Sequence, residues 1–390
     1  MRKEIFITGM GAVTPIGVGV PSYWAALLAG KCGICSNKDL EGLPVERAAL
    51  VRDFNPRDFM PKPLVLDMEP YAQYAYAAAQ EAVDQSGLTA AGERVGVVMA
   101  TALQGIAMLC AGAAPGPKLL TKYMGNLVAS QFAIHHGICG PSLTVSTACS
   151  SGGDAILLAA SLIESGAADA MVVLAGEAAV CPAVIRSLGL IRALSPLGES
   201  RPFDRSRSGF VMGEGGGALV LESAEHARAR GAEPLARLLG CANNNDAFHP
   251  VAPRPDGAGA ARCIADALQD AGVSPAQVDY INAHGTATQK GDVAETCAIR
   301  AVFGDRPVPV SSTKGATGHM MGAGGVTEVI ACVQAVRTGL CPPNLGLTEP
   351  DPACALNLVT AENRPERVSV ALSNAMGFGG QNSCVVVGAL

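Results

Sequence analysis

The chain has 390 residues, with 49% hydrophobic, 16% charged and 4% aromatic side chains, and a formal net charge of −6. This composition excludes a disordered chain, because disorder requires high charge and little hydrophobicity. The acidic balance argues against nucleic acid as a partner, since phosphate binding favours a basic surface. Small apolar residues and 46 glycines predict helices packed closely on sheets, with part of the surface covered by another subunit.

No stretch of the sequence predicts a membrane span or a secretory leader. Glu4 interrupts the N-terminal apolar run, and acidic residues break the most apolar region, residues 152–180. A membrane-spanning helix needs about 20 consecutive apolar residues, so we expect a cytoplasmic protein. Its 13 cysteines are expected to be reduced thiols. Cys32 and Cys35 lack the second pair that a zinc site requires, and we expect no metal.

The first half of the chain alternates short β-branched runs with Ala-rich segments of helical periodicity. The expected strands are Ile5–Thr8, Val95–Met99, Ser142–Thr147, Ala170–Leu174 and Ala218–Leu221, and the expected helices are Tyr23–Leu28 and Gly152–Ser165. Such alternation is typical of α/β proteins.

After Gly231 the same pattern starts again. Strands are expected near Leu235, Tyr280, Val308, Val368 and Val385, and helices from Ala260 and Glu295. A seam near residue 234 therefore predicts two α/β halves, residues 1–234 and 235–390. The two halves share no recognisable sequence repeat, so the sequence by itself does not demonstrate a duplication.

Cys149 is the first candidate for chemistry, because it stands between an expected strand and an expected helix. Its segment reads VSTACSSGG (residues 145–153), and the small neighbours allow a substrate to reach the sulfur. The dipole and free N–H groups of a helix N-terminus favour the thiolate, which is the nucleophilic form. The alternative is a buried cysteine at a tight turn.

Two histidines in Gly/Thr-rich loops form the second candidate. His284 stands in NAHGTATQKGD (residues 282–292) and His319 in STKGATGH (residues 312–319), each after an apolar strand. Loops at the carboxyl ends of parallel strands carry the sites of α/β proteins. A structural role is favoured for the remaining histidines, His135, His136, His226 and His249.

Phe378 stands between glycines near the C-terminal strand, in NAMGFGGQN (residues 374–382). The glycines allow this phenylalanine to move and its backbone N–H to approach a ligand closely. The alternative is a β-turn with an apolar plug. A phosphate-binding loop is disfavoured, because the segment opens no helix and the chain lacks GxxxxGK[ST].

Taken in order, these segments resemble the β-ketoacyl synthase (ketosynthase) family of fatty-acid and polyketide synthesis, in particular the discrete elongating synthases of type II systems. The likeness runs from end to end. Further motifs that carry it are ITGMG (residues 7–11), WAALLAG (24–30), RPFD (201–204), GFVMGEG (209–215) and LVLE (219–222).

The resemblance implies a thiolase-like fold, in which two duplicated α/β halves stack in an αβαβα arrangement and the protein works as a dimer. It also implies an acyltransferase. Cys149 takes an acyl chain from a carrier-protein thioester, and malonyl-acyl carrier protein then loses CO₂ and condenses with it. No permanently bound cofactor is implied, because the substrate arrives on the 4′-phosphopantetheine of acyl carrier protein.

The resemblance also assigns roles to the site residues. His284 and His319 donate hydrogen bonds to the extender's thioester oxygen, and the backbone N–H groups of Cys149 and Phe378 form an oxyanion hole. Phe378 is implied as a gate. The other implied residues are Lys314, paired with Glu295; Thr286 and Thr288 on the pantetheine arm; Leu103 and Met376 at the substrate pocket; and Asp292 and Glu328 as structural acids.

Some positions depart from the fatty-acid enzymes. Residues 62–67, a usual docking stretch, are poor in the basic residues that meet an acidic carrier protein; Lys118, Lys122 and Arg192 could compensate. Such departures favour a specialised polyketide or polyene synthase, as a homodimer or as a heterodimer with a ketosynthase-like chain length factor. The alternatives are a fatty-acid 3-oxoacyl synthase II, a non-catalytic partner subunit, and a thiolase-like transferase without decarboxylation.

Overall fold

The computed structural model describes residues 3–114, 116–362, 365 and 367–390. The strands are β1 Ile5–Thr14, β2 Gly17–Val18, β3 Ile34–Ser36, β4 Arg47–Ala49, β5 Val95–Ala100, β6 Ser142–Val145, β7 Ala170–Glu177, β8 Gly215–Ser223, β9 Ala236–Asn245, β10 Tyr280–Asn282, β11 Pro309–Ser311, β12 Asn357–Leu358, β13 Val370–Gly377 and β14 Gln381–Gly388. The helices are α1 Val20–Leu28, α2 Lys62–Asp67, α3 Pro70–Ser86, α4 Ile106–Cys110, α5 Leu119–Tyr123, α6 Asn126–His136, α7 Ser151–Glu164, α8 Pro182–Leu190, α9 Ala224–Ala229, α10 Ala258–Ala271, α11 Gln289–Phe303, α12 Lys314–Thr317 and α13 Met321–Thr338.

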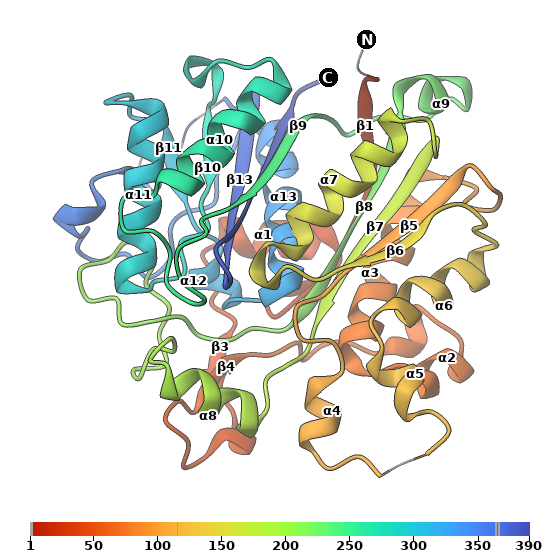
Figure 1. The fold of residues 1–390 in the computed structure, drawn as a ribbon, viewed down its shortest axis with the longest axis horizontal. Helices are drawn as coiled ribbons and strands as arrows, with labels where there is room; N and C mark the ends of the chain where they lie inside the picture. The colour runs from red at the N-terminus through yellow and green to blue at the C-terminus, as the bar shows by residue number, and fades with distance from the viewer. Residues whose placement is uncertain (1–2, 115, 363–364, 366) are drawn as a thin grey trace.

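All strands except the β3–β4 hairpin belong to one sheet, which is made of two similar parts (Figure 1). The N-terminal part has the order β6-β5-β7-β8-β1, and the C-terminal part has the order β11-β10-β13-β14-β9, with β12 at its edge. In each part three parallel strands are followed by two antiparallel ones. The strands of each part, numbered along the chain, therefore take the same places in the sheet. Duplication of one half explains this repeated topology.

The two parts of the sheet join through β1 and β9. Only three residue pairs make this ladder, between Ile5–Ile7 and residues 236–238. Helices α7 and α13 pack against strands of both parts, whereas α3 covers the other face of the N-terminal part and α10 and α11 lie outside the C-terminal part (Figure 1). The layers run αβαβα, and the predicted α/β class is confirmed.

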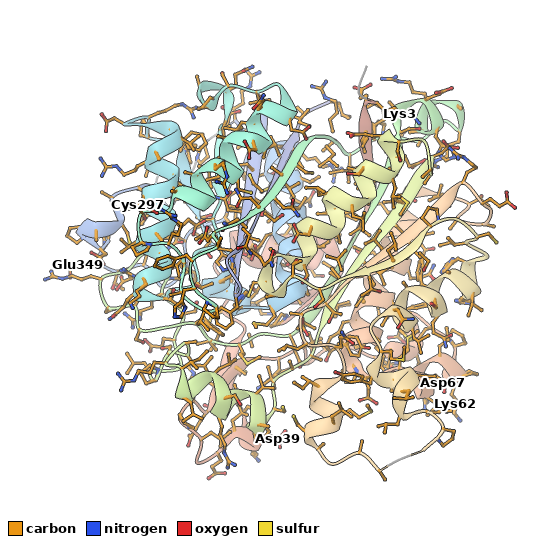
Figure 2. All side chains as sticks on the ribbon, in the orientation of Figure 1. Lys3, Asp39, Lys62, Asp67, Cys297 and Glu349 are labelled. Atoms are coloured by element: carbon orange, nitrogen blue, oxygen red, sulfur yellow. The ribbon has the colours of Figure 1, made fainter. Side chains whose placement is uncertain are left out.

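Glycine and alanine are abundant because the layers approach closely. A Cβ added to Gly9 on β1 would lie 2.0 Å from the carbonyl oxygen of Ala82 on α3, and one on Gly152 of α7 would lie 2.7 Å from the backbone nitrogen of Val326 on α13. Charged side chains are carried mainly on the outside, as the labelled Lys62, Asp67 and Glu349 illustrate (Figure 2). Small residues therefore set the spacing between layers.

Most expected elements are present with shifted ends. The strand before Cys149 ends at Val145 rather than Thr147, because the chain turns through Ala148 in a left-handed conformation (φ 53°). Helix α13 was absent from the sequence-based pattern; fifteen consecutive residues of it, 321–335, are buried, so no amphipathic stripe marks it. Among the described residues, no helix is long and apolar enough to cross a membrane.

Candidate active site

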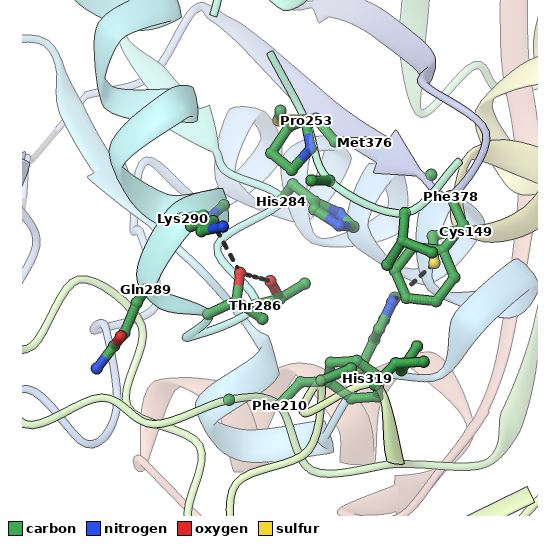
Figure 3. A pocket seen from close by; sticks show the side chains of 18 of the residues that line it. Cys149, Phe210, Pro253, His284, Thr286, Gln289, Lys290, His319, Met376 and Phe378 are labelled. Atoms are coloured by element: carbon green, nitrogen blue, oxygen red, sulfur yellow. Dashed lines mark hydrogen bonds between the residues drawn. The ribbon is translucent and has the colours of Figure 1, made fainter. Parts of the chain in front are cut away.

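A cavity of about 650 Å³ brings together the candidate residues of both halves (Figure 3). Its lining includes Cys149, His284, His319 and Phe378. Each of these follows a different parallel strand: β6, β10, β11 and β13, respectively. The carboxyl ends of the two sets of parallel strands therefore meet at one site, as the loop positions predicted.

Cys149 lies in the 3₁₀ turn Ala148–Ser150, directly before α7, and only 5% of it is exposed. Burial raises the pKa of its thiol to about 12, although the Lys314 charge and the Phe378 N–H, which donates to the sulfur, oppose the shift. The position at a helix N-terminus, which favours the thiolate, is therefore not sufficient to ionise the thiol at rest. Desolvation of the charge outweighs the Lys314 charge and the Phe378 N–H.

His319 is the hydrogen-bonding partner of this thiol. Its Nε2 lies 3.0 Å from Cys149 Sγ. The ring of His284 stands edge-on at 5.4 Å from that of His319, and Phe210 covers another side at 5.2 Å. Burial and then the nearby Lys314 charge hold the pKa of both histidines well below the usual range. Both imidazoles are therefore neutral at physiological pH.

The Lys314 side chain is buried and pairs with Glu328 on α13. The expected pairing of Lys314 with Glu295 is therefore wrong. Glu295 instead accepts the backbone N–H groups of His284 and Gly285, each at 2.7 Å. It fixes the loop that carries His284, because two bonds from consecutive amides hold the backbone in place. Lys314 thus influences the site through its charge. Glu295 influences it through the two carboxylate oxygens that accept hydrogen bonds from the His284 loop.

The loop after His284 is built around Asp292 and two threonines. Buried Asp292 accepts the N–H groups of Phe203 at 2.7 Å and Ala287 at 3.1 Å, and burial raises its pKa to about 7. Thr288 caps α11 by accepting the Gly291 N–H, and its hydroxyl lies 3.2 Å from that of Thr286. Both threonines line the cavity, and Thr286 is labelled in Figure 3.

Phe378 occupies the turn between β13 and β14. Gly379 and Gly380 follow it with φ of 85° and 75°, a region that favours glycine. Gly377 lies against the nucleophile's turn, since an added Cβ would stand 3.2 Å from the Cys149 backbone nitrogen. Met376 lines the cavity beside Phe378. The turn thus holds the Phe378 N–H at the sulfur.

Leu103 is the one predicted pocket residue that does not line this cavity. It packs in an apolar cluster that also contains Cys149 and Phe378. Glu177, at the end of β7, accepts the N–H groups of Ala102 and Leu103 at 2.8 and 3.1 Å. Leu103 therefore belongs to a packed apolar region next to the thiol, apart from the open cavity.

Several non-glycine residues at or beside the site have left-handed backbones, among them Ala148 (φ 53°), Ala287 (φ 65°) and Met321 (φ 45°). Ala148 precedes Cys149, and Ala287 separates the two threonines. Such conformations cost about 1–3 kcal/mol each and persist where surrounding structure enforces them. The backbone is strained where it aims side chains into the cavity.

Sequence reasoning missed several residues of the site. Phe210 and Lys290 stand in the motifs quoted above without an assigned role, and Glu177 appears there only as a charge that interrupts an apolar stretch. His249 was assigned a structural role; its Nδ1 accepts the Val251 and Ala252 N–H groups at 3.0 Å, and it also lines the cavity. In the described part of the chain, no group of three or more His, Cys, Asp or Glu residues could hold a metal ion.

Two family models match the chain. The one described as "Beta-ketoacyl synthase, N-terminal domain" covers residues 2–227, and the one described as "Beta-ketoacyl synthase, C-terminal domain" covers residues 235–348. The 3-oxoacyl-[acyl-carrier-protein] synthase 2 of Synechocystis sp. is 39% identical over 402 residues, which cover 98% of this chain and 97% of that protein. The same-named protein of Vibrio harveyi is 37% identical over 407 residues, covering 99% and 98%.

Solved structures show the same likeness over whole chains. "The ishigamide ketosynthase/chain length factor" superposes with a TM-score of 0.91 at 35% identity, with 100% of both chains covered. A β-ketoacyl synthase from Burkholderia phymatum gives a TM-score of 0.91 at 31% identity, again with 100% of both chains covered. These neighbours confirm the thiolase-like form of the α/β fold. The chain belongs to the β-ketoacyl synthase family, a family of acyltransferases.

Proposed function

We propose that this chain catalyses a decarboxylative Claisen condensation between an acyl group on Cys149 and malonyl-acyl carrier protein, giving a β-ketoacyl-acyl carrier protein. The observation that carries the proposal is the 3.0 Å contact between Cys149 Sγ and His319 Nε2, with His284 edge-on to the same ring. One nucleophile and two neutral imidazoles at the end of one cavity fit acyl transfer followed by stabilisation of an enolate.

In the first half-reaction, Cys149 Sγ attacks the carbonyl carbon of an acyl thioester. With a pKa of about 12 the thiol is protonated at rest, so its proton passes to His319 Nε2 as the sulfur–carbon bond forms. The carbon–sulfur bond of the incoming thioester then breaks. The departing pantetheine thiolate takes up the proton, and the acyl-enzyme remains.

In the second half-reaction, malonyl thioester occupies the cavity, and its carboxylate leaves as CO₂. The electron pair of the broken carbon–carbon bond forms an enolate, whose oxygen accepts hydrogen bonds from His284 and His319; His319, neutral again after acyl transfer, donates as its Nε2–H tautomer. The enolate carbon attacks the acyl-Cys149 carbonyl, and the Cys149 and Phe378 N–H groups hold the resulting oxyanion. Such donors, aimed where charge develops, each contribute a factor of about 10²–10³. Collapse releases the Cys149 thiolate, which takes up a proton from water and restores the resting thiol.

The remaining residues position the substrate and the loops. Thr286 and Thr288 contact the phosphopantetheine arm, which delivers the substrate without a permanently bound cofactor. Met376 shapes the cavity beside the Phe378 gate, and Leu103, in the apolar cluster next to the thiol, contacts the acyl chain carried on Cys149. The supporting acids, whose hydrogen bonds and charges support this assignment, are Asp292, Glu295 and Glu328. We place the boundary between the halves near residue 234, which the repeated strand order supports.

The pathway we propose is specialised polyketide or polyene synthesis, with fatty-acid elongation as the second candidate. The 3-oxoacyl synthase relatives support elongation. A solved type II PKS ketosynthase in complex with its acyl-carrier protein, 30% identical with a TM-score of 0.90, supports the polyketide reading and the carrier partner. We propose a dimer, either of this chain or with a chain length factor, in the cytoplasm. Copurification with the products of neighbouring genes distinguishes the two dimers.

The test of the proposal is acylation followed by malonyl-dependent CO₂ release. Wild-type protein incubated with acyl-acyl carrier protein should gain one acyl mass, measured by intact mass spectrometry. Cys149→Ala should gain none, while Cys139→Ala, which removes an exposed thiol, should be acylated normally. Acylation of Cys149→Ala would exclude the mechanism, and absence of acylation in folded wild type would revive the non-catalytic partner subunit.

A further inference from the structure

Two cysteines outside the catalytic cavity contact each other at the rim of the apolar cluster beside Cys149. Cys110 is the last residue of α4 and is exposed, and Cys181 directly precedes α8 and is half-buried. Their side chains form a sulfur–sulfur hydrogen bond. Neither thiol takes part in the reaction steps above, so the pair is available for chemistry of its own.

The sheet brings these two thiols together. Helix α4 follows β5 and α8 follows β7, and these strands are parallel neighbours that pair as far as Ala100 and Ala175. Glu177, at the end of β7, accepts the N–H of Leu103 at 3.1 Å and so ties the segment after β5 to β7. Both helices lie at the lower edge of the molecule in Figure 1. The contact between the thiols is therefore built on the backbone rather than on mobile side chains.

Other accessible thiols are differently placed. Cys32 donates to a carbonyl of α12 at 3.6 Å, and Cys35 donates to a carbonyl of β4 at 3.7 Å. Exposed Cys139 donates at 3.6 Å to a backbone carbonyl two residues before it. The CxxC spacing therefore binds its two thiols to different elements, whereas the tertiary structure joins the thiols of Cys110 and Cys181.

The surroundings of the two thiols suit two successive steps of disulfide exchange. Cys110 is open to solvent, where a bulky oxidant reaches it. Partial desolvation and then the neighbouring Cys181 raise the pKa of the Cys110 thiol, which is therefore protonated at rest. Cys181 occupies the N-cap of α8 and makes no capping hydrogen bond with its side chain. The free N–H groups of that helix end favour a thiolate, which suits Cys181 to the second attack.

We propose that Cys110 and Cys181 form a reversible disulfide on reaction with glutathione disulfide, and that this bond tethers α4 to α8. The Cys110 sulfur attacks the oxidant, whose S–S bond breaks, and one glutathione leaves with the proton of the Cys110 thiol. The Cys181 sulfur then attacks the mixed disulfide and displaces the second glutathione, which takes up the remaining proton. The two protein thiols lose two electrons, which reduce the oxidant to two thiols.

The tether acts on the wall of the acyl-chain region. Ile106 begins α4 and packs, together with Cys181, in the apolar cluster that contains Cys149 and Leu103. This part of the inference rests on the proposed function, which places the acyl chain in that cluster. Because the cluster is packed, a long chain on Cys149 needs α4 to yield. A disulfide that fixes α4 against α8 therefore opposes long acyl chains more than short ones.

Peptide mapping tests the disulfide. Wild-type protein is treated with glutathione disulfide, its free thiols are alkylated, and it is cleaved with trypsin and Glu-C, which release residues 95–118 and 178–186. We expect these two peptides to be linked, with the loss of both alkylatable thiols and their recovery after dithiothreitol. Cys110→Ser and Cys181→Ser should each lose the link, whereas Cys139→Ser, a matched change at an exposed thiol, should keep it.

A glutathione that stays on Cys110 while Cys181 is still alkylated would overturn the proposal, as would modification of Cys139 with both thiols of the pair left free. The tether is tested by rates of acylation from acetyl- and long-chain acyl-acyl carrier protein. Oxidised wild type should lose rate with the long chain alone, and oxidised Cys110→Ser should lose none. Equal effects on both chains would exclude the tether. The disulfide is read without substrate, so failure of Cys149 acylation is a separate outcome.

Discussion

At the scale of single residues, the site depends on one buried charge. Lys314 lies beneath the two histidines and the thiol and lowers the pKa of all three groups, although burial is the larger influence on each. Burial and the Lys314 charge both lower the pKa of His284 and His319. On Cys149 they oppose each other, because burial raises the thiol pKa and Lys314 lowers it. In the resting site, therefore, both imidazoles are neutral and the neighbouring thiol is protonated.

Lys314→Met should raise the pKa of both histidines towards its ordinary value of about 6.5. A protonated histidine cannot accept the thiol proton, so activity is lost as the pH falls through the histidine pKa. In wild type that pKa lies well below 6.5, and its rise in the variant moves the acid limb of the kcat/KM profile to higher pH. An unchanged acid limb would show that Lys314 does not set the histidine pKa.

The same substitution leaves Glu328 buried without its partner, which costs about 3–5 kcal/mol. Urea unfolding of Lys314→Met should register this loss of stability. The double variant Lys314→Met with Glu328→Gln serves as the control, because it removes the unpaired charge. Its stability should recover while its pH profile stays shifted, which separates the electrostatic role of Lys314 from its structural one.

At the scale of elements, the contact between the β13–β14 turn and the start of α7 determines whether the proposed oxyanion hole can form. Gly377 has room for hydrogen alone, since an added Cβ would stand 2.9 Å from the Thr147 carbonyl oxygen. Periodicity in the sequence predicted both strands and the helix. Periodicity did not predict how closely the turn and the helix approach each other. It also did not predict α13, because a uniformly buried helix lacks the alternation of apolar and polar residues on which such predictions depend.

Gly377→Ala should push the turn away from Cys149 and displace the Phe378 N–H. Losing one oxyanion donor lowers kcat by about 10²–10³-fold, and we expect KM to change little because the proposed pantetheine contacts, Thr286 and Thr288, stand on another loop. Steady-state kinetics measures both. The control is Gly189→Ala on α8, where an added Cβ meets only Pro44 at 3.6 Å. A wild-type kcat in Gly377→Ala would show that this contact is not essential.

At the scale of the whole molecule, β6 forms one edge of the sheet. Leu143 on this strand is 42% exposed, and Ile134 on the neighbouring α6 is 76% exposed. Apolar side chains beside an unprotected strand edge are typical of an interface, because such edges otherwise pair non-specifically. The low content of charged residues, first noticed in the composition, agrees with a covered surface here.

Leu143→Lys should convert the proposed dimer into monomers. In a two-fold interface the substitution acts twice and brings like charges together. Sedimentation velocity measures the mass in solution. Leu340→Lys, a comparably exposed position after α13, should leave the mass unchanged. A dimeric Leu143→Lys protein would place the interface elsewhere.

The sequence by itself determined the α/β alternation and the loops that carry Cys149, His284, His319 and Phe378, because these are local patterns and spacings. The partner of Lys314, the ion pairs of Lys118 with Asp67 and of Lys122 with Glu69, and the raised pKa of Cys149 were decided by the tertiary structure. Each of these depends on the distance between segments remote in the chain and on the burial that the assembled layers create. Electrostatics in a closed site therefore follows from the fold rather than from the motif.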